Sequence, residues 1–325
     1  MSLHLTKLQE KLCNLLQEGL PICERPYAGL AKFLNIDETT VLQQTVELKN
    51  GGIIRRISPL INYRALGMAG TLVTAHIPEE NLQEVVEAVN ALENVSHNYL
   101  RKHYHNLWFT LQGQSPEQIK AAVAGLSDRF GIDFYSLPVK RVFKLNVRFD
   151  IENGGQLSGD IEQMPQTQKV KLDEKEKQIL SKLQDELEVT EKPFDFLCRE
   201  GLETEEVLRI IQGLFDKGVI RRIAAVVDHR RLGFTANVLF CCEVPKNRII
   251  EAGKRLARFG LVSHCYQRET VKDWPYNLFA MMHGRSMGEI QHVINKFIEA
   301  EKIDSFEILP TAKELKKQPV KYRFY

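Results

Sequence analysis

The chain has 325 residues, with 44 Lys and Arg against 42 Asp and Glu and 43% hydrophobic residues. This composition excludes a disordered or collagen-like chain, and the length predicts about two domains. The net charge of +2 gives no overall field that would attract a nucleic acid or an anionic membrane. A polyanionic ligand would therefore have to be held by a local group of cations.

The six cysteines are spread along the chain and include no Cys-x-x-Cys pair. This usage favours reduced thiols and a cytoplasmic protein. Charged residues interrupt every apolar run near the N-terminus, so we expect neither a signal peptide nor membrane association.

The sequence is internally duplicated. Residues 52–67 and 218–233 are identical at eight of sixteen positions, and both contain Ile-Arg-Arg-Ile. Residues 95–101 and 262–268 keep five of seven positions in the pattern Val-Ser-His-x-Tyr-x-Arg. The segment 151–168, rich in Gly and Gln, has the composition of a linker between the two units.

Each unit begins with three short amphipathic helices that lead into the Ile-Arg-Arg strand. The helices are predicted at 8–16, 30–34 and 40–49 in unit 1, and at 179–187, 194–199 and 205–217 in unit 2. Three helices followed by a hairpin predict a winged helix-turn-helix over 1–68 and 169–234.

The rest of each unit alternates strand, helix, strand, strand, helix, strand. The strands include 70–77, 106–111, 238–244 and 277–282, and the helices show an apolar period of 3.6 residues. This order predicts ferredoxin-like βαββαβ modules over 69–150 and 235–325. The predicted fold is thus α+β, a tandem repeat of a winged helix-turn-helix and a ferredoxin-like module.

This architecture is that of the Lrp/AsnC regulators, so DNA binding has to be considered. The predicted recognition helices, 37–49 and 203–216, carry net charges of −2 and −3, which would repel DNA. We therefore expect no DNA binding and keep a transcriptional regulator as the alternative.

The repeated polar pattern indicates a ligand site. Strand alternation places His97, Tyr99, Arg101 and His103 on one face, and His264, Tyr266 and Arg268 on the matching face of unit 2. We expect this polar face to be the open face of the sheet; a solvated edge or an interface between the units is the alternative.

Arginines are the second indication. Guanidinium groups bind carboxylates bidentately, so two local arginine sets suit a ligand with several carboxylates, although a single arginine is more often part of a surface ion pair. The sets include Arg55, Arg56, Arg101, Arg221, Arg222, Arg230 and Arg268.

Other histidines and two tryptophans are further candidates for the site. His103 and His105, with His97 as a third ligand, could bind zinc, but unit 2 has no equivalent, so we expect no metal held by the protein alone. His229 and His283 are further candidate acids or bases. Trp108 and Trp274 are either core residues or a surface on which a planar macrocycle would stack.

The segment 96–110, Ser-His-Asn-Tyr-Leu-Arg-Lys-His-Tyr-His-Asn-Leu-Trp-Phe-Thr, resembles one subunit type of the siroheme decarboxylases. The segments 220–222, 229–234, 263–266 and 273–279 resemble the other subunit type. The resemblance covers nearly the whole chain and identifies a fused two-subunit member, from haem d1 or alternative haem biosynthesis. In unit 1, Tyr63 replaces His229 of unit 2, so an Arg-adjacent histidine exists in one unit only.

The resemblance implies a substrate and a reaction. The substrate is siroheme, an iron isobacteriochlorin with eight carboxylates, and the C12 and C18 acetate carboxyls are removed to give 12,18-didecarboxysiroheme. The resemblance implies no added cofactor, and the substrate carries its own iron. A tetrapyrrole-sensing DNA-binding protein remains a rival function, and we expect the two halves to pair, with a homodimer as a further option.

The candidate site has thirteen residues. The candidate acids and bases are His97, His103, His264 and His229. The candidate carboxylate-binding residues are Arg55, Arg56, Tyr99, Arg101, Arg221, Arg222, Arg230, Tyr266 and Arg268.

Overall fold

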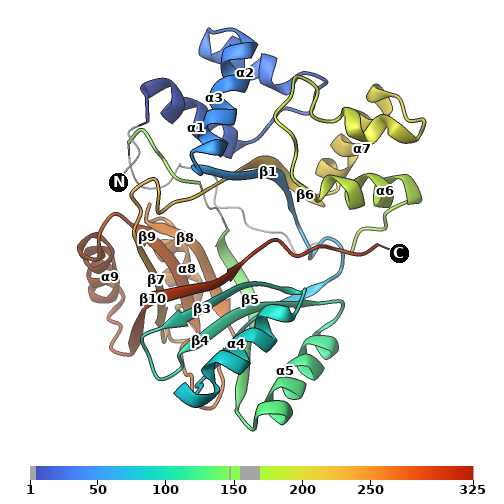
Figure 1. The fold of residues 1–325 in the computed structure, drawn as a ribbon. Coiled ribbons are helices and arrows are strands. Elements are labelled where there is room, and N and C mark those ends of the chain that lie inside the picture. Colours follow the sequence, from blue (N-terminus) through green and yellow to red (C-terminus); the bar gives the residue numbers. More distant parts are fainter. Residues whose placement is uncertain (1–4, 146–147, 154–168, 325) are drawn as a thin grey trace.

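The computed structural model describes residues 5–145, 148–153 and 169–324, and it confirms the predicted α+β fold (Figure 1). The helices are α1 (Lys7–Glu18), α2 (Pro26–Leu34), α3 (Glu38–Asn50), α4 (Leu82–Ala91), α5 (Pro116–Phe130), α6 (Glu174–Leu183), α7 (Thr204–Asp216), α8 (Ile249–Ala257) and α9 (Met287–Glu301). The strands are β1 (Ile54–Ile61), β2 (Ala69–Ala75), β3 (Val95–Arg101), β4 (Leu107–Gly113), β5 (Phe134–Leu145), β6 (Ile220–Val227), β7 (Ala236–Cys242), β8 (Val262–Arg268), β9 (Leu278–Gly284) and β10 (Phe306–Lys317).

The first helix of each unit starts at a capping box. Thr6 and Gln9 exchange side-chain and backbone hydrogen bonds at the start of α1, and Asp173 and Glu176 do the same at α6. The helix predicted at 194–199 is a 3-10 helix, Asp195–Glu200. None of the described helices has both the length and the apolar character needed to cross a bilayer.

The hairpin predicted in each winged-helix segment is wrong. β1 of unit 1 pairs antiparallel with β6 of unit 2, with Ile57 opposite Ala225. Each unit supplies one strand to this pair. The backbone N–H and C=O groups of β1 therefore bond to those of β6, and neither strand keeps this edge unpaired. The two winged-helix segments are thereby joined above the rest of the molecule (Figure 1).

The ferredoxin-like modules also pair, and their strands form one closed sheet in the order β10-β3-β4-β2-β5-β8-β9-β7. The first half of β5 pairs with β2 and the second half with β8. In the same way, β10 pairs first with β7 and then with β3. The expected pairing of the two halves is therefore confirmed, and each half completes the sheet of the other.

Two kinds of core follow from strand alternation. One set of side chains packs under α4 and α5, or under α8 and α9, on the outside of the sheet (Figure 1). Trp108, Trp274, Leu137, Leu239 and Leu309 form a separate cluster on the opposite, inner face. Both tryptophans are 1% exposed, so they are core residues and offer no surface for stacking.

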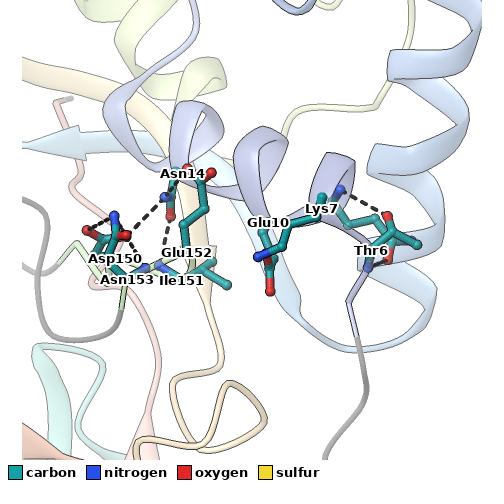
Figure 2. A network of polar contacts seen from close by, with 9 residues as sticks. Thr6, Lys7, Glu10, Asn14, Asp150, Ile151, Glu152 and Asn153 are labelled. Carbon is teal, nitrogen blue, oxygen red and sulfur yellow. Dashed lines mark hydrogen bonds and ion pairs between the residues drawn. The ribbon is translucent and has the colours of Figure 1, made fainter.

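The segment 148–153, which follows β5, lies against α1 and is bound there by the side-chain amides of Asn14 and Gln17. Asn14 donates to Asp150 and Glu152 and accepts from the backbone N–H of Ile151 at 3.0 Å (Figure 2). Gln17 bonds both backbone groups of Phe149, at 2.8 and 3.0 Å. These contacts fix Phe149 beside the site described below. Of the predicted linker, 154–168 lie outside the described residues.

Candidate functional site

Two ladders of polar side chains line the inner face of the closed sheet. In β3, Asn98 points outward and donates to Asn90 of α4 at 3.0 Å, so the alternating residues His97, Tyr99 and Arg101 point inward. We call these three residues ladder 1. In β8, Cys265 packs outward against Gly253 of α8, which leaves the matching inner residues of ladder 2. Ladder 2 consists of His264, Tyr266 and Arg268.

The arginines of the ladders are buried without a carboxylate. Arg101 is 4% exposed and donates to Leu309 O at 2.7 Å and Thr311 Oγ1 at 3.2 Å; Arg268 is 8% exposed and donates to Leu137 O at 2.7 Å. The Nε of each has no hydrogen-bond partner, and neither forms an ion pair with any residue that the structure describes. Burial lowers the pKa of Arg101 to about 10, so it remains charged at neutral pH. Two such cations favour the binding of an anion.

Ladder 1 is surrounded by charged side chains from both units. In the β10–β3 pair, Glu314 lies opposite Tyr99 and Lys317 opposite His97. From the winged-helix layer, Arg55 of β1 reaches Asp228 at 2.8 Å and Glu314 at 3.6 Å. We call this region the ladder-1 site.

A pair of histidines from unit 2 belongs to the same site. The rings of His229 and His283 lie 4.9 Å apart and nearly edge-on, and Phe149 stacks on His229 at 5.6 Å. His229 and His283 are 3% and 6% exposed.

A chain of hydrogen bonds links this pair to ladder 1. Arg101 donates to Thr311 Oγ1, and Thr311 donates to Asn237 Oδ1 at 2.9 Å. The Asn237 amide nitrogen lies 3.4 Å from His283 Nδ1. The arginine and the histidine pair are therefore positioned by one buried network.

The ladder-2 site lacks most of these titratable groups. Val142 lies opposite Tyr266, and Leu145 opposite His264, where the ladder-1 site has Glu314 and Lys317. Gln112 has the register position of His283, and Tyr63 replaces His229. Of its arginines, Arg221 donates to Leu145 O at 2.8 Å, and Arg64 donates to the Tyr63 hydroxyl at 3.4 Å.

The four inner histidines have strongly lowered pKa values. Burial, followed by the charges of Lys317, Arg56 and Arg55, lowers the pKa of His97 to about 4. Burial lowers the pKa of His229 and of His264 to about 3, and that of His283 well below its usual value. Lys317 contributes to the shifts of His97, His229 and His283. Burial is the largest cause of all four shifts, and it favours the neutral form of each ring.

Of the thirteen predicted site residues, six form the two ladders, five lie around them and two lie elsewhere. His103 is not on the ladder, because β3 ends at Arg101 and the chain then turns; its Nε2 lies 3.8 Å from Glu307 and its ring packs on Trp274. Arg222 packs beside Gly19 at the end of α1. Within the described part of the chain, no group of three or more His, Cys, Asp or Glu could hold a metal ion.

Asp228, Glu314 and Lys317 belong to the site but were not predicted from the sequence, and His283 was predicted only as a further candidate acid or base. These residues stand at positions where the two units differ, whereas the repeated patterns contain only what the units share. A comparison of unlike residues at equivalent positions, such as Asn62 with Asp228, would have pointed to them.

Comparisons with known proteins agree with this architecture. The model of the AsnC-like ligand binding domain matches residues 65–144 and 231–316, and that of the siroheme decarboxylase NirDL-like HTH domain matches 9–55. The siroheme decarboxylase of Hydrogenobacter thermophilus is 36% identical over 96% of this chain and 94% of its own. The siroheme decarboxylase NirDL subunit of Paracoccus denitrificans is 30% identical over 88% of each chain.

Solved structures give the same result. The chain is similar to the crystal structure of the siroheme decarboxylase NirDL, with a TM-score of 0.74, 33% identity, and coverage of 98% of this chain and 94% of that one. A second NirDL structure, in co-complex with an iron-uroporphyrin III analogue, also has a TM-score of 0.74, at 33% identity and with coverage of 96% and 93%.

Proposed function

The chain belongs to the siroheme decarboxylase family, and from this premise we propose that it removes the C12 and C18 acetate carboxyls of siroheme to give 12,18-didecarboxysiroheme. The observation that carries the proposal is the pair of buried guanidinium groups, Arg101 and Arg268, that have no carboxylate among the described residues. A ligand with eight carboxylates supplies the anions that these cations lack.

The reaction balances with one proton for each carboxyl. The bond between the acetate methylene and the carboxylate carbon breaks, CO2 leaves, and the electron pair remains on the methylene carbon, delocalised into the macrocycle. A proton then converts the methylene to a methyl group. Because the macrocycle accepts the electron pair and the proton restores neutrality, no added organic cofactor enters the scheme.

The inner histidines can supply that proton once the substrate is bound. In the free protein, burial and the charges of Lys317, Arg55 and Arg230 hold the pKa of His229 to about 3. Substrate carboxylates near these cations act in the opposite direction, so they raise the pKa of the histidines and favour their protonation. Proton donation is thereby coupled to the presence of the anion that needs it.

We place the reaction at the ladder-1 site. Besides the ladder histidine His97, it contains His229, His283 and Lys317, whereas the ladder-2 site has Tyr63, Gln112 and Leu145 at the three corresponding positions. Arg55, Arg101 and Arg230 would hold neighbouring carboxylates, while the reacting carboxylate is enclosed away from water, which favours its departure as neutral CO2.

DNA recognition is the second candidate, and two observations argue against it. β1 and β6, which would form the wings, are paired with each other. The first turn of α7 carries Glu205 and Glu206. A DNA-binding regulator needs at least one recognition helix with a cationic surface that contacts the phosphates.

The test is turnover of siroheme by the purified chain, followed by mass spectrometry. We expect stepwise loss of two CO2 units and no salt-dependent mobility shift with DNA. Unchanged siroheme under reducing, anaerobic conditions would refute the proposal, and a mobility shift together with unchanged siroheme would favour the regulator.

A further inference from the structure

An aromatic ring from the segment after β5 lies against the histidine pair of the ladder-1 site. Phe149 is 1% exposed, and its ring centroid lies 5.6 Å from that of His229 and 5.4 Å from that of His283. The ring stacks on His229 at an interplanar angle of 15° and meets His283 edge-on at 83°. Phe234 lies 4.8 Å from the same ring. Aromatic rings at these distances prefer defined relative orientations, so Phe149 restrains both histidines.

The backbone of Phe149 is held by the winged-helix layer. Gln17 of α1, which is 1% exposed, accepts from the Phe149 N–H at 2.8 Å and donates to its carbonyl oxygen at 3.0 Å. A backbone N–H only donates and a carbonyl only accepts, so the two bonds fix the Gln17 amide in one orientation. One turn earlier, Asn14 accepts from the N–H of Ile151 at 3.0 Å (Figure 2). Helix α1 therefore determines where the Phe149 ring lies.

Unit 2 repeats this arrangement after β10. Gln184, at the end of α6, accepts from the Tyr322 N–H at 2.6 Å and donates to its carbonyl oxygen at 3.0 Å. The Tyr322 hydroxyl donates to Gln112 Oε1 at 3.0 Å, and Gln112 has the register position of His283. Each unit thus presents one ring to the same position of the other unit. The ring at the histidine pair is Phe149, and the ring at the ladder-2 site is Tyr322.

We propose that Phe149 is a positioning residue for the reaction, because its ring, held by Gln17, fixes the orientation of His229 and His283. The winged-helix layer then has a task at the site, since Gln17 belongs to its first helix. The catalytic meaning of this inference rests on the proposed function. The proposal predicts that Phe149 matters for turnover, whereas Tyr322 does not.

The first measurement is the steady-state rate of siroheme decarboxylation. F149L keeps an apolar side chain but removes the planar ring, and it should lower kcat on the order of tenfold to a hundredfold while KM changes less, as misplacement of a catalytic group does. F149Y keeps the ring and should recover most of the rate. Y322L is the matched control in the other unit and should stay within a few-fold of wild type.

The second measurement is the 1H–13C correlation spectrum of the histidine rings in the ligand-free full chain. The variants H229Q and H283Q assign the two signals. We expect one sharp signal for each ring in wild type, and exchange broadening of both in F149L, because the rings are no longer held in one orientation. F149Y should restore the sharp signals, and Y322L should leave them sharp.

A second pair of variants tests the attachment to α1. Q17L keeps the Phe149 ring but removes both bonds to its backbone, so it should lower kcat and broaden the His229 and His283 signals. Q184L removes the equivalent bonds to Tyr322 and should do neither.

A folded F149L with the wild-type kcat would overturn the proposal, and so would equal losses of kcat in F149L and Y322L. If F149L does not fold, an unchanged kcat in Q17L would overturn it. Broadened His229 and His283 signals in the wild-type protein would overturn it whether or not the variants fold. Because the spectra are recorded without substrate, a protein that shows the expected signals but leaves siroheme intact would refute the proposed function and not this inference.

Discussion

His229 and His283 lie with their rings 4.9 Å apart at an interplanar angle of 68°, and both come from unit 2, while the ladder beside them comes from unit 1. The corresponding residues of the other site are Tyr63 and Gln112. The duplicated chain thus pairs its halves to build one site rich in histidine and one without this pair.

The histidine pair should be required for turnover. H229A is expected to lower kcat by about 10²–10⁴, which is the range for loss of a positioned acid or base. Y63F, at the equivalent position of the other unit, is the matched control and should stay within a few-fold of wild type. Steady-state rates from product mass would show this difference. Equal losses in both variants would contradict the assignment of the reaction to the ladder-1 site.

Lys317 should hold down the pKa values of three histidines. K317L places at this position the residue that lies opposite His264, Leu145. Removal of the positive charge should raise the pKa values of His97, His229 and His283. An NMR pH titration of the ligand-free protein measures these values.

K313L, on an exposed position of the same strand, is the control for the Lys317 experiment. It should leave the three titrations unchanged. Equal shifts in K317L and K313L would show that the effect is not local to the site.

Stability should fall on mild acidification. The inner histidines have folded-state pKa values below the ordinary 6.5, so the unfolded chain takes up protons first as the pH falls. The free energy of unfolding is therefore highest above about pH 6.5 and decreases towards pH 4, by about 1.4 kcal/mol per pH unit for each such histidine. Urea unfolding at several pH values measures the slope.

The variant H264Q should reduce the slope of the unfolding free energy against pH by the contribution of one histidine. H292Q, at an exposed position of α9, is the control for the substitution itself. A stability that does not change between pH 7 and pH 5 would contradict the burial of neutral rings.

The buried arginines should cost stability in the free protein. R101M removes an uncompensated charge, so we expect the free energy of unfolding to stay the same or to rise by about 1–4 kcal/mol, although the bond to Leu309 O is lost. Binding of siroheme, followed by its absorbance, should weaken in the same variant. A large loss of stability with unchanged binding would show that Arg101 is structural.

The sequence alone determined the repeat, the helices and the order of helices and strands along the chain. These features depend on periodicity, caps and turns, which are local properties of the chain. It also selected the two ladders, since strand alternation defines which side chains share a face. His103 was misplaced because the end of β3 depends on how the chain turns after Arg101.

Only the tertiary structure decided how the copies combine. The second half of β10 pairs with β3 of the other unit, which brings Lys317 opposite His97. The β1–β6 pair brings Arg55 within 2.8 Å of Asp228. These contacts join residues that lie more than 150 positions apart. No local pattern specifies them, because they arise from the satisfaction of open strand edges by the other half of the chain.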